Sequence, residues 1–302
     1  MDKNVDNSWN AEQNPNVASA LSWQAQRQPN ATAIHYPAGG AFGKEKYVEC
    51  SYRELDELSD CYARGLHAYG ITAGTRTALM LTPGLDFFAM FFALFKAGAV
   101  PVLIDPGIGM KPLKQCLAEA SPKAFIGVTK AHFARKILGW AKESCELLVT
   151  AGPRLGLGGI SLKKLREMGE SSSEETRHEV GPNDMAAILF TSGSTGVPKG
   201  VVYRHRHFNA QVRMLQKAFD IQPGEVSLPT FPPFALFDPA HDSRYINQQK
   251  MSVEVRGYPV NEPRQPVVRV SWQQAMAFCE WLYRRTGENF SLPRKQFLLV
   301  GG

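Results

Sequence analysis

Short apolar runs alternate with amphipathic segments along residues 14–190. Apolar runs that suit buried strands lie at residues 77–81, 100–104, 124–128, 146–150 and 185–190. Apolar residues at helical spacing predict helices at residues 16–28, 51–69 and 131–142, and Ser51 with Glu54 forms a capping box. Because strands that alternate with helices form parallel sheets, we expect an α/β fold of parallel sheets covered by helices.

The most apolar stretch of the chain, residues 87–104, approaches the length of a membrane span. Lys96 lies near its middle, and Gly98 and Pro101 follow. This pattern favours a buried helix that ends near Gly98 and continues into a buried strand, and no integral membrane span is expected. Further on, residues 168–184 turn polar, which predicts a connection on the surface.

The amino-acid composition limits the classes of function that the protein can have. The 302 residues carry a net charge of +6, with 44% hydrophobic and 21% charged residues, which is typical of a soluble globular protein. The positive charge suits acidic ligands such as nucleotides, but basic and aromatic residues are not interleaved, so nucleic acid is not an expected partner. Five widely spaced cysteines match neither a disulfide framework nor a zinc site, and the polar N-terminal residues lack the apolar core of a signal peptide. We expect a cytoplasmic protein.

The predicted strand at residues 185–190 runs directly into a loop of small polar residues, within LFTSGSTGVPKGVV. Four hydroxyls, three glycines and a lysine are concentrated there: Thr191, Ser192, Gly193, Ser194, Thr195, Gly196, Lys199 and Gly200. Such a loop directs amide and hydroxyl donors toward one place and adds a cation, as polyphosphate binding requires. It is not a Walker A loop, because proline precedes the lysine. The alternative is a solvated Ser/Gly turn.

The segment TSGSTGVPKG resembles the phosphate-binding signature of the adenylate-forming superfamily, which includes acyl-CoA synthetases and peptide-synthetase adenylation domains. LFKAGAVPVLIDP, residues 94–106, is similar to an early core motif of that superfamily. GEVSLPTFPPFALFDPA, residues 224–240, resembles its acyl-pocket region, with Ala235 where many CoA ligases have histidine. The sequence of this segment looks most like that of the olefin-pathway β-lactone synthetases. The resemblance to the superfamily covers about residues 14–240.

The resemblance implies the N-terminal subdomains of the adenylate-forming fold and a role for each residue of the loop. The residues that would bind the phosphates of ATP are Thr191, Ser192, Gly193, Ser194, Thr195, Gly196 and Lys199. Lys199 would be catalytic, neutralising charge while a fatty or β-hydroxy fatty carboxylate attacks the α-phosphorus, with ATP and Mg²⁺ as cofactors. No metal-ligand residues are predicted. His205 lies where relatives often have histidine; a structural role is favoured over contact with substrate.

Beyond residue 240 the sequence no longer resembles the adenylate-forming superfamily. Residues 241–293 resemble a fragment of the formylglycine-generating-enzyme superfamily, through QPVVRVSWQQAMAFCEWLYRRTGENFSLP. There Ser271 and Gln274 form a capping box, and Cys279 is expected on the buried side of a helix. The expected organisation is a polar tail at residues 1–13, an AMP-binding domain at 14–240, this fragment at 241–293 and a tail at 294–302.

Two hypotheses of function remain. The later motifs of adenylate-forming enzymes are not found after Ala240, which predicts a truncated ligase that binds nucleotide weakly and turns over little or nothing alone. The alternative is a non-enzymatic fusion remnant or nucleotide-binding module that arose from a fused or disrupted reading frame. The acyl chain, its acceptor and the oligomeric state are not indicated by the sequence.

Overall fold

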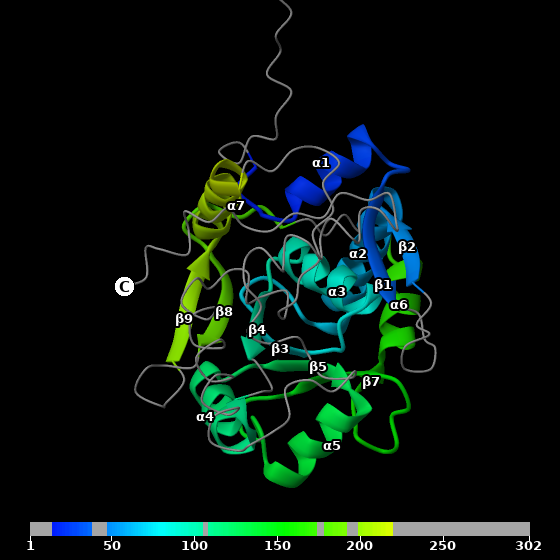
Figure 1. Cartoon of the computed structure of the whole chain (residues 1–302). Coiled ribbons are helices and arrows are strands. Elements are labelled where there is room, and N and C mark those ends of the chain that lie inside the picture. The colour runs from blue at the N-terminus through cyan, green and yellow to red at the C-terminus, as the bar shows by residue number, and fades with distance from the viewer. Residues whose placement is uncertain (1–13, 38–46, 105–107, 174–177, 192–198, 220–302) are drawn as a thin grey trace, which may run out of the picture. The chain divides into compact units, whose positions relative to one another are not determined.

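The computed structural model of the chain describes residues 14–37, 47–104, 108–173, 178–191 and 199–219 (Figure 1). The chain divides into two compact units, Met1–Asn209 and Ala210–Gly302. All the elements below belong to the first unit, except that the last helix continues into the second. The expected boundaries near residues 240 and 293, and the segment between them, lie outside the described residues and stay predictions.

Seven helices and nine strands are present in the described part of the chain. The helices are α1 (Ser19–Arg27), α2 (Tyr52–Tyr69), α3 (Leu85–Lys96), α4 (Met110–Ala120), α5 (Thr129–Leu138), α6 (Leu162–Ser171) and α7 (His205–Phe219). The strands are β1 (Thr32–Pro37), β2 (Tyr47–Ser51), β3 (Arg76–Met80), β4 (Val100–Ile104), β5 (Ala124–Val128), β6 (Leu147–Ala151), β7 (Ile160–Ser161), β8 (Met185–Thr191) and β9 (Lys199–Arg204). All five strands predicted from apolar runs are present within one residue of their expected bounds.

Seven strands form one sheet in the order β7-β6-β5-β3-β4-β8-β9. Every neighbouring pair is parallel except β8 and β9, which are antiparallel. β1 and β2 form a separate antiparallel pair. The expected α/β class with parallel strands covered by helices is confirmed, and β9 is the one antiparallel strand among the described strands of this sheet. Only residues 192–198 join β8 to β9, and a parallel neighbour needs a crossover of about a dozen residues or more.

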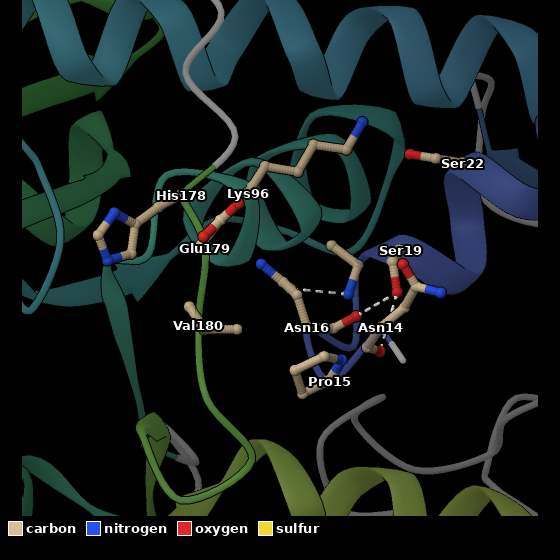
Figure 2. A pocket seen from close by; sticks show the side chains of 10 residues that line it. Asn14, Pro15, Asn16, Ser19, Ser22, Lys96, His178, Glu179 and Val180 are labelled. Atoms are coloured by element: carbon tan, nitrogen blue, oxygen red, sulfur yellow. Dashed lines mark hydrogen bonds between the residues drawn. The ribbon is translucent and has the colours of Figure 1, made fainter. Parts of the chain in front are cut away.

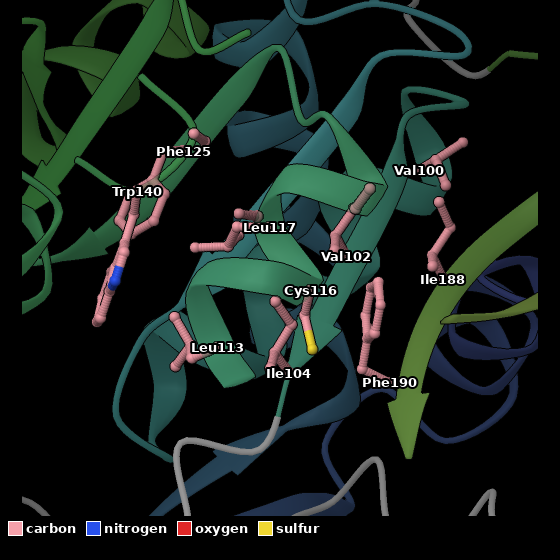
Figure 3. Packing of buried hydrophobic residues seen from close by; sticks show 13 residues of the cluster. Val100, Val102, Ile104, Leu113, Cys116, Leu117, Phe125, Trp140, Ile188 and Phe190 are labelled. Atoms are coloured by element: carbon pink, nitrogen blue, oxygen red, sulfur yellow. The ribbon is translucent and has the colours of Figure 1, made fainter. Parts of the chain in front are cut away.

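Helices cover both faces of this sheet, with α4 and α5 on one face and α2 and α3 on the other (Figure 1). Under α4, side chains of the central strands form a continuous apolar core with that helix (Figure 3). Leu117 of α4 and Phe125 of β5 are fully buried in it, and Ile104 and Phe190 extend it toward β8. Burial of each such side chain stabilises the fold by about 1.5–3 kcal/mol, which makes the sheet a rigid support for the loops at its edge.

The apolar stretch at residues 87–104 forms α3 and β4, as expected from Lys96, Gly98 and Pro101. Every residue of β4 is buried, and Gly98 has a φ of 67°, a left-handed conformation that lets the chain turn between the two elements. In the part of the chain that the structure describes, no helix is long and apolar enough to cross a membrane.

The capping box of α2 forms as predicted. The Glu54 N–H donates to Ser51 Oγ at 3.3 Å, and the Ser51 N–H donates to Glu54 Oε2 at 2.8 Å. Gly70, with a φ of 95°, ends the helix. These signals are local, which explains why this helix could be predicted to within one residue at each end.

Three predicted boundaries are wrong by three or four residues. The helix expected at residues 16–28 is α1, which begins at Ser19. The surface connection expected at residues 168–184 begins later, because residues 168–171 belong to α6, whose Gly169 is buried against α2. The helix expected at residues 131–142 is α5, which ends at Leu138 since Gly139 adopts a φ of 65°. Trp140 is buried beyond the helix end, so it contributed to the apolar pattern without being helical.

Candidate functional site

The polar loop of the sequence connects β8 and β9 at the edge of the sheet. Thr191 is the last residue of β8 and pairs with Lys199, the first residue of β9. Lys199 is exposed. Ser192, Gly193, Ser194, Thr195 and Gly196 lie outside the described residues, so their roles stay predictions. The fold thus brings the two ends of the candidate loop side by side.

Strand β8, which leads into this loop, is paired with β4 on one side and with β9 on the other. β8 pairs in parallel with β4, with Ile104 opposite Phe190, and residues 186–190 are buried. The loop therefore begins where the parallel strands β4 and β8 both end at their carboxyl ends. In open α/β sheets this edge is where ligands bind. The position supports a binding site at the loop on grounds of topology.

Gly200 allows β9 to lie close to β8 directly after Lys199. A Cβ atom at Gly200 would be 2.9 Å from the Phe190 ring and 3.3 Å from Glu119 Oε1 of α4. Contacts this short would displace the Phe190 ring or the strand, so packing favours glycine at this position. One glycine of the motif thus has a structural role that is independent of any ligand.

His205 is the first residue of α7 and is only 2% exposed. Its Nδ1 accepts a hydrogen bond from the Val17 N–H at 3.3 Å, and its ring lies 6.0 Å from that of Phe95. Asn209, one turn later, donates to the Pro15 carbonyl at 2.9 Å. These contacts join α7 to the segment before α1, which supports the structural role favoured for His205 over contact with substrate.

Burial lowers the pKa of His205 from its ordinary value of 6.5 to about 4, since the charged imidazolium would lose its hydration; nearby Asp184 raises it by less. The unfolded chain binds a proton at this residue as the pH falls through 6.5, whereas the folded chain stays neutral down to about 4. We therefore expect the free energy of unfolding to fall by about 2 kcal/mol between pH 7 and pH 5 on account of His205. Urea unfolding at the two pH values measures this loss.

The matched variant for this test is His205→Asn, whose side-chain oxygen can still accept from the Val17 N–H. We expect a smaller loss of stability between pH 7 and pH 5 in this variant than in the parent chain. Some pH dependence should remain, because burial also lowers the pKa of His132. An equal loss in both proteins would show that His205 is not kept neutral by the fold.

A buried cluster of charges that the sequence analysis did not identify lies between α2 and α3. Lys96 is 3% exposed, and its Nζ donates to Asp56 Oδ1 and Asp60 Oδ1, each at 2.7 Å, and to the Asp56 carbonyl at 3.0 Å. Ser22 Oγ of α1 also donates to Asp56 Oδ1, at 2.7 Å. The sequence contained one signal for this cluster. Asp56 and Asp60 lie four residues apart in a predicted helix, and Lys96 is the lysine of a predicted apolar helix.

A cavity of about 470 Å³ lies beside this cluster, lined by residues 14–16 and 178–180, by α1 and by Lys96 (Figure 2). Figure 2 shows the Lys96 ammonium directed toward Ser22. All three N–H groups of the ammonium are used in the contacts with Asp56 and Asp60. None of the described residues that line the cavity belongs to the candidate loop, and the contacts of Lys96 with Asp56 and Asp60 join α3 to α2.

Within the described residues, no group of three or more His, Cys, Asp or Glu side chains is placed to hold a metal ion. Mg²⁺ in nucleotide sites is bound largely through phosphate oxygens and water. A magnesium ion at the loop would therefore be held mainly by its nucleotide.

Comparison with known proteins extends the resemblance read from the sequence. The family described as "AMP-binding enzyme" matches residues 21–238. The "Olefin beta-lactone synthetase" of Xanthomonas campestris pv. campestris is 53% identical over 227 residues, which are 74% of this chain and 40% of that protein. The protein of the same name from Stenotrophomonas maltophilia is 54% identical over 228 residues, 74% of this chain and 41% of that protein. The chain thus spans about two fifths of the length of these relatives.

Solved structures agree with the fold described above. A long-chain-fatty-acid-CoA ligase from Archaeoglobus fulgidus superimposes with a TM-score of 0.60 at 20% identity, covering 74% of this chain and 43% of that one. At this identity the similarity concerns the fold alone. The family match spans most of the chain, including the β8–β9 loop, and two relatives are more than half identical to the chain over 227 and 228 residues. The chain therefore belongs to the AMP-binding enzyme family.

Proposed function

We propose that the chain carries the phosphate-binding part of an ATP-dependent adenylate-forming ligase that acts on a fatty or β-hydroxy fatty carboxylate. One observation carries the proposal: the motif TSGSTGVPKG lies on the β8–β9 connection, where the parallel strands end. The two olefin beta-lactone synthetases, which are more than half identical to this chain, support the choice of acid.

In the proposed reaction a carboxylate oxygen of the acid attacks the α-phosphorus of ATP and forms the acyl phosphate bond. The bond from this phosphorus to the bridging oxygen breaks, and pyrophosphate leaves with the electron pair. Thr191 to Gly196 would donate hydrogen bonds to the β- and γ-phosphates, and Lys199 would balance the charge that develops on the leaving group. Mg²⁺, bound with ATP, would neutralise phosphate charge. A later closure of a β-hydroxyacyl adenylate to a β-lactone would be the task of the whole ligase.

Titration of MgATP into the purified chain by calorimetry tests the loop assignment. We expect binding by the parent and at least a tenfold loss of affinity in the double variant Thr195→Ala/Lys199→Ala, because hydrogen bonds to charged groups contribute about 1.5–3 kcal/mol each. Addition of a long-chain β-hydroxy acid should then give pyrophosphate exchange only if the chain completes adenylation on its own.

The matched control is Lys163→Ala, which removes an 87% exposed lysine from α6, distant in sequence from the loop. Its affinity for MgATP should equal that of the parent. Equal affinity of the parent and the double variant would show that the loop does not bind the phosphates. Absence of MgATP binding by the parent would favour the alternative of a non-enzymatic remnant.

A further inference from the structure

An apolar stripe occupies the outer side of α5. Phe133 is 56% exposed and Ile137, one turn later, is 67% exposed. Together with Lys130 and Ala134 they line one wall of an open groove of about 460 Å³. Helix α5 covers the sheet with its opposite side, where His132 is fully buried against Phe125. The stripe is therefore additional to the apolar side that α5 needs for packing.

The other wall of the groove comes from two different parts of the chain. Leu155, in the loop after β6, is 76% exposed, and Met110, at the start of α4, is 53% exposed. Leu155 adopts a φ of 43°, which is uncommon for a residue with a side chain. Thr129 Oγ1 fixes this loop to the start of α5 by donating to the Pro153 carbonyl at 2.7 Å. Three elements thus present large apolar side chains to one opening.

Basic residues adjoin the exposed apolar side chains. Lys111 follows Met110, Lys136 precedes Ile137, Arg154 precedes Leu155, and all three basic side chains are exposed. Lys130, one turn before Phe133, lines the groove itself. Residues 108–160 contain eight lysines and arginines but three glutamates, a net charge of +5, whereas the whole chain has +6. Nearly all the net positive charge of the protein is therefore in the segment that forms this groove.

An apolar groove that has Lys130 in its lining, with exposed basic residues next in sequence to three other lining residues, matches the chemistry of an anionic lipid surface. The headgroups of such a surface attract lysine and arginine, while its acyl region accepts apolar side chains. A neutral protein partner would explain the apolar stripe but not the basic residues beside it. We infer that the groove between α5, Leu155 and Met110 is the site at which this protein binds reversibly to the surface of an anionic phospholipid membrane. The inference is independent of the proposed function, since none of the groove residues belongs to the phosphate loop.

Co-sedimentation of the full 302-residue chain with vesicles tests the inference. We expect binding to vesicles of phosphatidylglycerol and phosphatidylcholine in equal parts, and little binding to phosphatidylcholine alone. The variant Lys130→Gln/Lys136→Gln should bind the anionic vesicles about 25-fold more weakly, since each lysine near the surface contributes about fivefold. Phe133→Ser/Ile137→Ser should bind at least about tenfold more weakly, because two apolar side chains no longer enter the lipid.

Matched controls lie on other elements. Lys163→Gln/Lys164→Gln removes the same charge from exposed positions of α6, and Tyr47→Ser removes a side chain that is 67% exposed, as Ile137 is. Both should bind vesicles as the parent does. Thermal unfolding of each variant checks that the fold is retained, which the exposure of the replaced side chains leads us to expect.

Three results would overturn the inference. One is failure of the parent to bind anionic vesicles. A second is equal binding by the parent and by correctly folded groove variants, or equal weakening in the α6 control. The third is concentration-dependent self-association in ultracentrifugation that Phe133→Ser/Ile137→Ser abolishes, without vesicle binding, which would make a second copy of the chain the occupant of the groove.

Discussion

Replacement of Lys96 by methionine is expected to lower the free energy of unfolding by about 3–5 kcal/mol, the usual result of removing one partner from a buried ion pair. Methionine is one heavy atom shorter than lysine but retains an unbranched apolar stem, so little packing is lost. The loss arises from Asp56 and Asp60, which are 14% and 25% exposed and would face each other without the ammonium that lies 2.7 Å from both. Urea unfolding at neutral pH measures the change.

The control is Lys163→Met on α6, where the lysine is 87% exposed and lies 4.0 Å from Glu167. Loss of this exposed ion pair should change the free energy of unfolding by about 0.5 kcal/mol or less. In Lys96→Met, the further replacement Asp60→Asn should restore part of the stability, because one of the two neighbouring carboxylates is then neutral. If Lys96→Met is as stable as the parent, the buried cluster contributes nothing to the joining of α2 and α3.

Replacement of Gly169 by valine is expected to destabilise the fold by about 3 kcal/mol, at the upper end of the range for overpacking. A Cβ at Gly169 of α6 would overlap the Cys61 carbonyl of α2, and a Cβ at Gly65 would overlap the Leu165 carbonyl. Glycines on both helices therefore let the two backbones touch. Side-chain rotation cannot relieve a clash with backbone, so the helices must separate. Chemical unfolding with far-UV circular dichroism measures the loss.

Gly181→Val provides the control for this variant. The nearest atom to a Cβ at Gly181 is Asp184 Oδ2 at 3.5 Å, an ordinary contact. We expect a change within about 0.5 kcal/mol, as for most surface substitutions. The smaller replacement Gly169→Ala should give an intermediate loss, since alanine adds the clash but gains helix propensity. A Gly169→Val variant as stable as the parent would mean that α2 and α6 are free to move apart.

Five of the strands could be predicted because their signals are local, and so could α2, the longest amphipathic helix in the described part of the chain. Strands β1, β2, β7 and β9 were not predicted. Residues 100–104 are apolar throughout and form the fully buried β4, and Ser51 with Glu54 places the start of α2 by a contact across three residues. The position of the β8–β9 loop could likewise be predicted, since the sequence shows a buried strand followed by small polar residues. Its binding role stays a prediction.

Features that depend on contacts between distant segments could not be predicted in this way. The burial of Lys96 is compensated by aspartates forty and thirty-six residues earlier, which only the packing of α3 on α2 brings together. The sequence of α6 is mostly polar because only a narrow side of the helix is buried. Since the backbones of α2 and α6 touch, three small or apolar residues cover the contact: Leu162, Leu165 and Gly169. The reversed direction of β9 depends on the length of its connection and not on the apolar pattern of the strand.

The pairing of Thr191 with Lys199 has an entropic consequence for ligand affinity. Bringing together the ends of a flexible loop costs free energy, and each doubling of loop length adds about 0.6 kcal/mol. In this protein the hydrogen bonds between β8 and β9 offset the free-energy cost of loop closure when the chain folds, before any ligand binds. A ligand bound at this loop, as proposed above, would therefore not have to bring the two ends of the loop together. A longer connection between Thr191 and Lys199 would for the same reason lower the stability of the β8–β9 pairing.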